Sequence, residues 1–147
     1  MKINLALVAA GLALAAPAFA DSHDGMTGDP AKGEKAFRQC VACHTVQNDA
    51  GEKLAGRGAK TGPNLYGLPG RKAGHEDGFR YSTAMQEAAD NGLVWTEDNF
   101  IAYVQDPTAF LRDFSGDNSV RSNMTFKLRH KEDAPDIYAY LAKLAAE

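Results

Sequence analysis

Two cysteines and a histidine stand close together in the run Cys40-Val41-Ala42-Cys43-His44. The spacing C-x-x-C-H is the arrangement by which two thiols bond covalently to one edge of a haem. The histidine that follows the second cysteine then lies beneath the iron, where an imidazole is a suitable ligand. These residues predict one haem c, attached by two thioether bonds through Cys40 and Cys43, with His44 bound to the iron.

The same two cysteines have three other interpretations. In an oxidising compartment a pair of cysteines is ordinarily a disulfide. A thioredoxin-like redox pair is typical of a βαβ setting, which the hydrophobic pattern lacks, and a zinc site needs further closely spaced Cys or His ligands. The five-residue spacing therefore favours haem attachment over all three.

The second axial position of the iron has several methionine and histidine candidates, namely Met26, Met85, Met124, His23, His75 and His130. Met85 stands among alanines in a helical stretch, where a methionine more often packs, and Met26 and His23 belong to a disordered-looking tail. Met124 follows a polar segment and is placed to cross a haem face as a strap. The residues alone favour Met124 without deciding the ligand.

The first twenty residues have the pattern of a cleaved secretory signal peptide. Lys2 is followed by an apolar stretch and by the small-residue triplet Ala18-Phe19-Ala20. A membrane anchor fits less well, because the run is short for a span and is interrupted by Pro17. We expect a periplasmic protein with no membrane span after cleavage.

The charge balance of the mature chain is mildly acidic. The whole chain has 16 basic and 19 acidic residues, and cleavage removes one lysine and no acid, so the formal charge changes from −3 to −4. This balance argues against nucleic acid as a partner. The remaining 127 residues suffice for one domain. We expect a flexible tail over residues 21–28, a single domain over 29–147, and a monomer.

Capping residues and hydrophobic spacing predict an all-α domain. Asp29 and Pro30 predict the start of a helix that ends at the C-x-x-C-H motif. Further helices are expected over 82–89, after Thr96, and from near residue 133, with a short turn at Asp106 and Pro107. The first and last helices are expected to pack together.

The segment from Thr45 to Gly78 is predicted as a long glycine-rich loop, and no strand pattern appears in the chain. A structureless run of this length is unusual in a compact domain. It becomes reasonable if the loop wraps a large cofactor that supplies the missing core. A small chain gains from such a tethered apolar group, because its own apolar area is limited.

Several motifs in order resemble those of class I cytochromes c, and most closely the bacterial cytochromes c2. The run of motifs comprises Gly33 and Phe37 before CVACH, TGPNLYGLPGR (61–71), GFRYS (78–82), Trp95, YVQDP (103–107) and MTFKL (124–128). The resemblance implies the class I cytochrome c fold, with about five short helices wrapped around one covalently bound haem. The chain departs from the short mitochondrial form by an extended loop around 47–60 and an insertion around 113–122.

The resemblance also implies roles for individual residues. Met124 would be the sixth iron ligand, the carbonyl of Pro63 would accept from the His44 ring, and Tyr103 would lie near the methionine sulfur. Three further residues would surround the haem propionates, because buried carboxylates need cations or hydrogen-bond donors: Arg71, Tyr81 and Trp95. By residue type alone, a solvated arginine and two core aromatics would be the simpler interpretation.

The resemblance implies a one-electron carrier and not an enzyme. Such a protein would accept electrons from a cytochrome bc complex and pass them to a photosynthetic reaction centre or a terminal oxidase. The alternative is a peroxidase-like haem enzyme or sensor with a labile sixth ligand, for which no distal His-Arg pair is apparent. A basic face is expected at the exposed haem edge for acidic partners, formed by Lys53, Arg57, Lys60, Arg71, Lys72, Arg112, Arg121, Lys127, Arg129 and Lys131.

Overall fold

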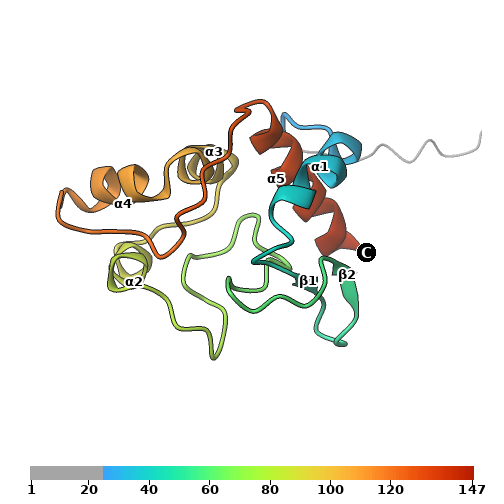
Figure 1. Cartoon of the computed structure of the whole chain (residues 1–147), viewed down its shortest axis with the longest axis horizontal. Coiled ribbons are helices and arrows are strands. Elements are labelled where there is room, and N and C mark those ends of the chain that lie inside the picture. Colours follow the sequence, from blue (N-terminus) through green and yellow to red (C-terminus); the bar gives the residue numbers. More distant parts are fainter. Residues whose placement is uncertain (1–24) are drawn as a thin grey trace, which may run out of the picture.

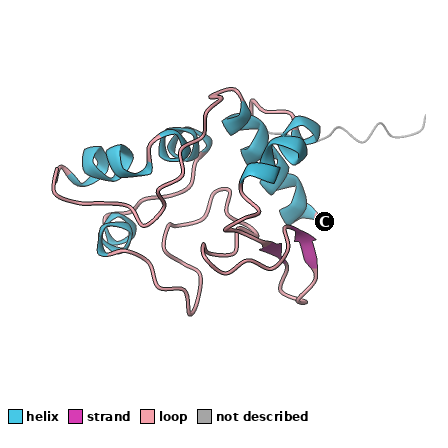
Figure 2. Cartoon of the chain, in the orientation of Figure 1, coloured by secondary structure: helices cyan, strands magenta, loops and turns pink. Residues whose placement is uncertain are grey.

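The structure is a computed structural model in which residues 25–147 are described. These residues form five α-helices, one 3₁₀ helix and a small sheet (Figures 1 and 2). In chain order the elements are α1 (Pro30–Ala36), the 3₁₀ helix η1 (Phe37–Gln39), β1 (Val46–Gln47), β2 (Lys53–Ala55), α2 (Thr83–Asp90), α3 (Glu97–Gln105), α4 (Pro107–Ser115) and α5 (Asp133–Ala146). The predicted helical class is confirmed. The predicted signal peptide, residues 1–20, and His23 lie outside the described residues.

The first and last helices cross at a close contact, as predicted (Figure 1). Gly33 lies at the crossing, where a Cβ atom would collide with the backbone carbonyl of Asp136 on α5. Phe37 and Tyr140 pack beside it, with ring centroids 5.7 Å apart. Only a residue without a side chain lets the two helix backbones approach this closely.

Side-chain caps set the start of α1, α2 and α3, which confirms the caps predicted at Asp29 and Thr96. Asp29, Ser82 and Thr96 each accept a hydrogen bond from a backbone N–H in the first turn of the helix that follows. Each cap satisfies a donor that has no partner inside the helix. Asn91 and Gly92 end α2, and Gly92 has the left-handed φ of 89° that suits glycine.

The prediction of only a short turn at Asp106 and Pro107 is wrong, because α4 runs for nine residues. Asp106 accepts a hydrogen bond from the Ala109 N–H at 3.1 Å. Pro107 interrupts α3 but occupies the first turn of α4, where its missing N–H costs nothing. Leu111 is fully buried, and Gly116 ends the helix in the left-handed conformation.

The first helix ends before the C-x-x-C-H motif rather than at it. α1 gives way to η1, and the Cys40 N–H donates to the carbonyl of Phe37 at 2.8 Å. The motif then forms a turn in which the N–H groups of Cys43 and His44 both donate to the Cys40 carbonyl. A tightened 3₁₀ turn is common at a helix end. It brings the two thiols and the imidazole into one compact turn.

The prediction that the chain has no strands is also wrong. β1 and β2 pair antiparallel, with Val46 opposite Ala55 and a bulge after Val46. The Asn48 side chain closes the connecting turn by accepting from the Glu52 N–H at 2.9 Å. The two strands have two and three residues, which is too short for an alternating hydrophobic pattern.

The last residues of the segment expected to be a tail contact the domain. The backbone N–H and hydroxyl of Thr27 both donate to the Glu97 carboxylate, at 3.0 Å to Oε1 in each case. Gly28 lies so close to α5 that a Cβ would collide with the Pro135 carbonyl. In residues 25–147 there is no helix with the length and apolar character needed to span a membrane.

Candidate functional site

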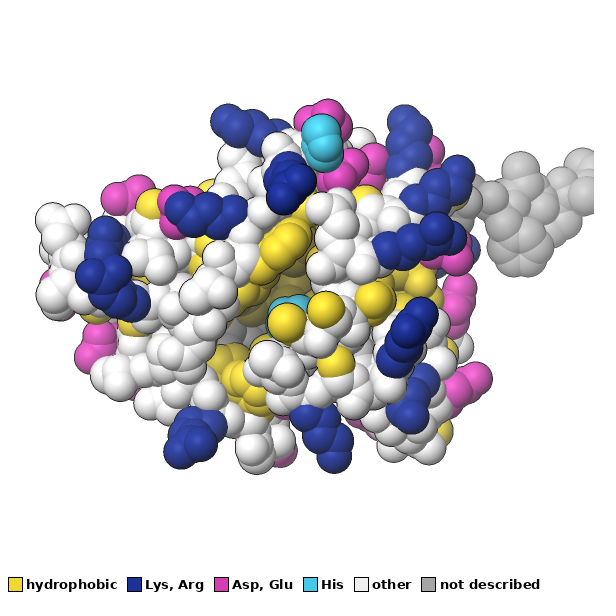
Figure 3. All heavy atoms as spheres, in the orientation of Figure 1, with side chains coloured by type: hydrophobic (Ala, Val, Ile, Leu, Met, Phe, Trp, Pro, Cys, Tyr) yellow, Lys and Arg dark blue, Asp and Glu magenta, His cyan; other side chains and the backbone are white. Residues whose placement is uncertain are grey.

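The structure contains a cavity of about 250 Å³ with mostly apolar walls. Its wall combines the C-x-x-C-H motif, the loop between β2 and α2, α3, and residues 122–126. Most of its lining side chains are apolar or aromatic, including Leu65, Leu68, Phe79, Met85, Phe100, Val104, Phe126 and Ile137. Figure 3 shows a hollow with hydrophobic side chains gathered at its walls. The long loop thus lines a cavity, as expected of a loop that wraps a cofactor.

Cys40 and Cys43 line this cavity, and both thiols are free. Burial, and to a lesser extent the neighbouring Cys43, raises the pKa of the Cys40 thiol from 9.0 to about 11. A dithiol oxidoreductase needs a lowered thiol pKa, because the thiolate is the attacking species. The environment of Cys40 therefore disfavours the redox-pair alternative.

The ring of His44 is held by a hydrogen bond to the backbone of Pro63. Its Nδ1 lies 2.9 Å from the carbonyl oxygen of Pro63, which only accepts, so Nδ1 carries the ring proton. Burial lowers the pKa of His44, against a smaller opposing effect of that hydrogen bond. The imidazole is therefore neutral near pH 7, with the lone pair of Nε2 free to bind a metal.

Gly62 allows the loop to lie against this imidazole. A Cβ at Gly62 would lie 2.6 Å from the Nδ1 of His44 and 2.8 Å from its Nε2. The Gly62 N–H donates to the Cys43 carbonyl at 2.7 Å, which fixes the loop beside the motif. The close approach explains the need for glycine at this position.

Met124 reaches the same cavity from the segment of residues 120–128, called here the methionine segment. Its N–H donates to the Ser122 hydroxyl oxygen at 3.1 Å. Met85 also lines the cavity but comes from α2, where it is 6% exposed and packs among alanines. His130 is not among the lining residues, and its ring lies 3.6 Å from the Glu132 carboxylate on the surface.

Five contacts tie the methionine segment to α3, α4 and the junction between them. Two involve α4, which donates from the Arg112 Nε to the Val120 carbonyl at 3.1 Å and accepts at the Thr108 hydroxyl. The others are Tyr103 to Ser122, Lys127 to Asp106, and Leu128 N–H to the Val104 carbonyl. The predicted insertion therefore continues α4 and returns along it, so that Met124 is held at several points.

Tyr103 lines the cavity, and its hydroxyl lies 3.1 Å from that of Ser122. Burial raises the pKa of Tyr103, against the smaller effect of this hydrogen bond. Trp95 packs edge-on against Tyr103, with ring centroids 5.0 Å apart. Ser122 therefore links Tyr103 to the backbone of Met124, a role that nothing in the sequence distinguished from that of other polar residues nearby.

The three residues expected at the propionates are only partly brought together. Tyr81 and Trp95 line the cavity, whereas Arg71 does not. The Arg71 guanidinium donates to the Tyr66 carbonyl at 3.0 Å, and the Arg71 carbonyl accepts from the Trp95 N–H at 2.8 Å. His75, which the sequence offered only as an alternative iron ligand, also lines the cavity.

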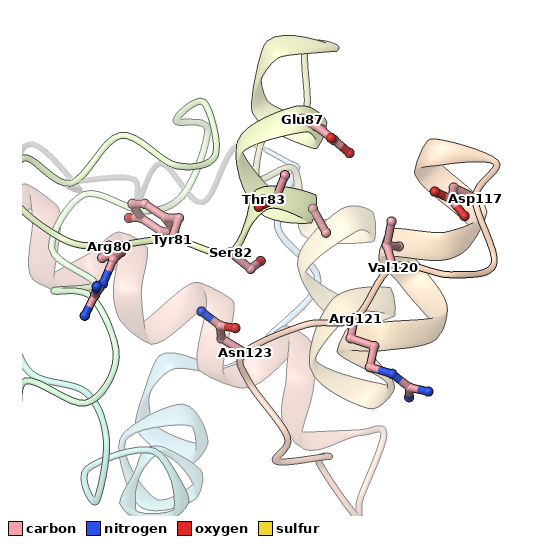
Figure 4. Close-up of a pocket in the computed structure, with 10 residues that line it drawn as sticks. Arg80, Tyr81, Ser82, Thr83, Glu87, Asp117, Val120, Arg121 and Asn123 are labelled. Atoms are coloured by element: carbon pink, nitrogen blue, oxygen red, sulfur yellow. The ribbon is translucent and has the colours of Figure 1, made fainter.

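A second cavity of about 490 Å³ lies between the start of α2 and residues 117–123 (Figure 4). Its lining is mainly polar and charged, and Arg80 and Arg121 point away from each other on its two sides. It contains no thiol, imidazole or thioether. Its larger volume therefore does not make it the functional site, and the chemistry belongs to the apolar cavity.

The apolar cavity fits a haem c. It offers two thiols and a neutral imidazole from one turn, a thioether from another segment, and apolar walls for a large flat ring. Helices arranged around such a cavity, with C-x-x-C-H and methionine side chains in its wall, define the class I c-type cytochromes.

Comparison with known proteins assigns the family. No family model matches the chain. The chain is 60% identical over 119 residues to cytochrome c2 of Rhodovulum adriaticum, covering 81% of this chain and 94% of the relative. It is 48% identical over 147 residues to cytochrome c2 of Cereibacter sphaeroides, covering 99% and 98%. The solved cytochrome c2 of Rhodobacter sphaeroides superposes with a TM-score of 0.78 at 51% identity, covering 80% of this chain and 97% of that one.

The chain belongs to the cytochrome c2 family. The family carries a covalently attached haem c, and its members are electron carriers and not enzymes. The resemblance predicted from the motifs is therefore confirmed, together with the class I fold and the cofactor.

Proposed function

We propose that the protein is a monomeric periplasmic carrier that accepts one electron from a cytochrome bc complex and passes it to a photosynthetic reaction centre or a terminal oxidase. One observation carries this proposal: a single apolar cavity brings together Cys40, Cys43, His44 and Met124. The high identity to cytochromes c2 along most of the chain supports the same function.

The proposed roles follow from the chemistry of each side chain. Cys40 and Cys43 would form the two thioether bonds, and the Nε2 of His44 would bind the iron, because Pro63 holds the Nδ1 proton. Met124 would supply its sulfur as the other protein ligand of the iron. The bound haem supplies an iron that gains and loses one electron. A thioether favours reduced iron, so His and Met ligation raises the reduction potential.

With both His44 and Met124 bound, the iron would have no place for oxygen or peroxide, which suits a carrier. The five contacts that hold the methionine segment support this closure. Tyr81 and Trp95 are proposed to border the haem propionates, with Arg71 adding positive charge from just outside the cavity. Tyr103 is proposed to act near the methionine through Ser122.

Export is proposed from the N-terminal pattern. Residues 1–20 would be removed as a signal peptide, leaving a tail over 21–28 and the cytochrome domain over 29–147. Covalent attachment of haem through the C-x-x-C-H motif would then take place after export. Both proposed partners are membrane complexes, so the carrier would diffuse between them.

The test is the absorption spectrum of the mature haem-loaded protein, oxidised and reduced, with Met124→Ala beside the wild type. The wild type should give a low-spin c-type spectrum and the weak far-red band of iron–sulfur bonding when oxidised. Met124→Ala should lose that band, bind carbon monoxide rapidly and have a reduction potential lower by on the order of 0.2 V, since axial ligation sets potentials over about 0.8 V.

Met85→Leu is the matched control, because Met85 lines the same cavity from a helix. This variant should keep the far-red band and bind no carbon monoxide. If the band disappears in Met85→Leu and survives in Met124→Ala, then the ligand assignment is wrong. A wild-type protein without covalent haem would remove the basis of the proposed function.

A further inference from the structure

Asn64 directly follows Pro63, and both polar atoms of its side chain bind backbone groups. Its Oδ1 accepts from the Gln47 N–H at 2.9 Å and from the Tyr66 N–H at 3.2 Å, and its Nδ2 donates to the Gln47 carbonyl at 2.8 Å. Asn64 lines the apolar cavity, yet the proposed haem chemistry gives it no role. With two bonds accepted and one donated, this amide forms a fixed joint between two segments of the chain.

The Asn64 amide takes the place of a neighbouring strand beside β1. In an antiparallel pair, two opposed residues exchange both of their N–H···O bonds, and Asn64 makes both such bonds with Gln47. The Leu65 N–H adds a further bond, to the Thr45 carbonyl at 2.9 Å. β1 is therefore joined to the loop that carries Pro63 as well as to β2.

The hairpin of β1 and β2 also packs against the backbone of His44. Gly56 directly follows β2, and a Cβ at this position would lie 2.8 Å from the His44 carbonyl oxygen. The hairpin therefore contacts His44 directly and reaches Pro63 through Asn64. These two residues are the partners in the hydrogen bond between Nδ1 and the Pro63 carbonyl, which is 2.9 Å long.

We propose that Asn64 is a positioning residue for the histidine ligand: it fixes the Pro63 carbonyl relative to His44 Nδ1, and so determines how strongly the imidazole donates to the iron. This inference rests on the proposed function, in which His44 binds the iron of a covalently attached haem. A hydrogen bond at Nδ1 raises the basicity of a metal-bound imidazole. A more basic ligand favours oxidised iron, so a short bond to Pro63 lowers the reduction potential.

Loss of the Asn64 amide would leave the loop around Pro63 with fewer restraints. The N–H groups of Gly62 and Leu65 would still bind the chain around the C-x-x-C-H motif, each through one bond. Gln47 would lose the partners of its backbone N–H and carbonyl, which lie in a partly buried place where unpaired groups are costly. The loop would then relax, the bond to Nδ1 would lengthen, and the imidazole would donate less to the iron.

The test compares the haem-loaded wild type with Asn64→Ala and Asn64→Ser. Both variants should have a higher reduction potential than the wild type. In the reduced protein, NMR should show the Nδ1 proton of His44 exchanging with solvent on the order of tenfold faster. A serine hydroxyl can still accept from the Tyr66 N–H two residues on, but it cannot make both bonds to Gln47. Asn64→Ser therefore keeps the local turn and removes only the connection to β1.

Asn48→Ala is the matched control, because the Asn48 side chain stabilises the same hairpin at its turn, where it accepts from the Glu52 N–H at 2.9 Å. This variant should lower thermal stability and leave both the potential and the proton exchange unchanged. Equal potentials in the wild type and Asn64→Ser would overturn the proposal. The same shift in Asn48→Ala as in Asn64→Ser would also overturn it, by making the effect one of general stability. The wild-type spectrum tests the proposed function separately, so the two failures are distinct.

Discussion

Gly62 and Pro63 determine the orientation and tautomer of the His44 ring, although neither has a reactive side chain. The Pro63 carbonyl selects the tautomer of the imidazole, and the bare Cα of Gly62 lets the loop lie against the ring. Both effects act on the nitrogen proposed to bind iron. Backbone geometry therefore sets the orientation of this ligand.

Gly62→Ala should disturb the histidine ligand. The added Cβ would lie 2.6 Å from Nδ1, and the loop cannot retreat freely because the Gly62 N–H is bonded to Cys43. Overpacking of this kind costs about 1–3 kcal/mol. We expect a lower midpoint of thermal unfolding together with an altered reduction potential.

Gly70→Ala provides the comparison, because Gly70 has a φ of 76° and open space around its Cα. This substitution should reduce stability through backbone strain and leave the potential unchanged. Equal potentials in wild type and Gly62→Ala would contradict the steric role assigned to Gly62.

Residue types and spacing allowed the prediction of Cys40, Cys43 and His44, because covalent attachment requires a local pattern. Ser122 could not be predicted in the same way. It acts through a neighbour brought close by the fold, since its contact Tyr103 lies 19 residues away in the sequence. A serine in a loop has no local signal that marks such a contact.

At the scale of elements, the junction of α3 and α4 supports the methionine segment. Asp106 lies at this junction and has two partners, since it accepts from the Ala109 N–H and forms an ion pair with Lys127 at 2.6 Å. One carboxylate therefore both starts α4 and holds the chain three residues beyond Met124. Arg112 and Thr108 on α4 add the contacts farther back.

The pH dependence of stability should reflect Asp106. Its hydrogen bond with Lys127 and, next, that with Ala109 lower its pKa below the ordinary 3.8. A lowered pKa in the folded state means that the contribution is complete above 3.8 and is lost as the pH falls through the lower folded value. Asp106→Asn should therefore lose less stability than the wild type between neutral and strongly acidic pH, measured by urea unfolding.

Asp117→Asn is a matched control, because Asp117 also has a lowered pKa through Ser119 but lies before the methionine segment. Both variants should flatten the acid dependence. Only Asp106→Asn should weaken the far-red iron–sulfur band at neutral pH. A band in Asp106→Asn as strong as that of the wild type at neutral pH would show that the ion pair does not hold Met124.

Helix starts were predictable because a cap is a local feature, as at Asp29 and Thr96. The extent of α4 was missed because Pro107 follows the end of one helix and is also the first residue of the next. In the sequence, a proline at this point indicates the end of a helix more clearly than the start of another. The two short strands were missed because their pairing depends on the turn around Asn48 and not on alternation.

At the scale of the whole molecule, net charge and local charge differ. The chain is acidic overall, and Figure 3 shows many Lys and Arg side chains, with some Asp and Glu among them, around the edge of the face that contains the hollow. Such an arrangement would orient the carrier toward an acidic docking site and speed encounter. It affects the rate of association more than the strength of binding.

Electron transfer to a purified reaction centre or oxidase should therefore slow with salt. The second-order rate constant should fall at least about tenfold between roughly 0.01 and 0.5 M ionic strength. Lys72→Gln should lower it at low salt, whereas Lys143→Gln, on α5 beside Glu147, should not. A rate constant that stays flat across ionic strength would contradict the basic face.

The crossing of α1 and α5 joins the two ends of the domain, and it also sets an order of events during synthesis. α1 is synthesised well before α5, so the surface around Gly33 has no partner until the last residues arrive. Contacts this far apart in sequence form late. The thiols just beyond α1 therefore belong to a part of the chain that cannot complete its packing until α5 has been synthesised.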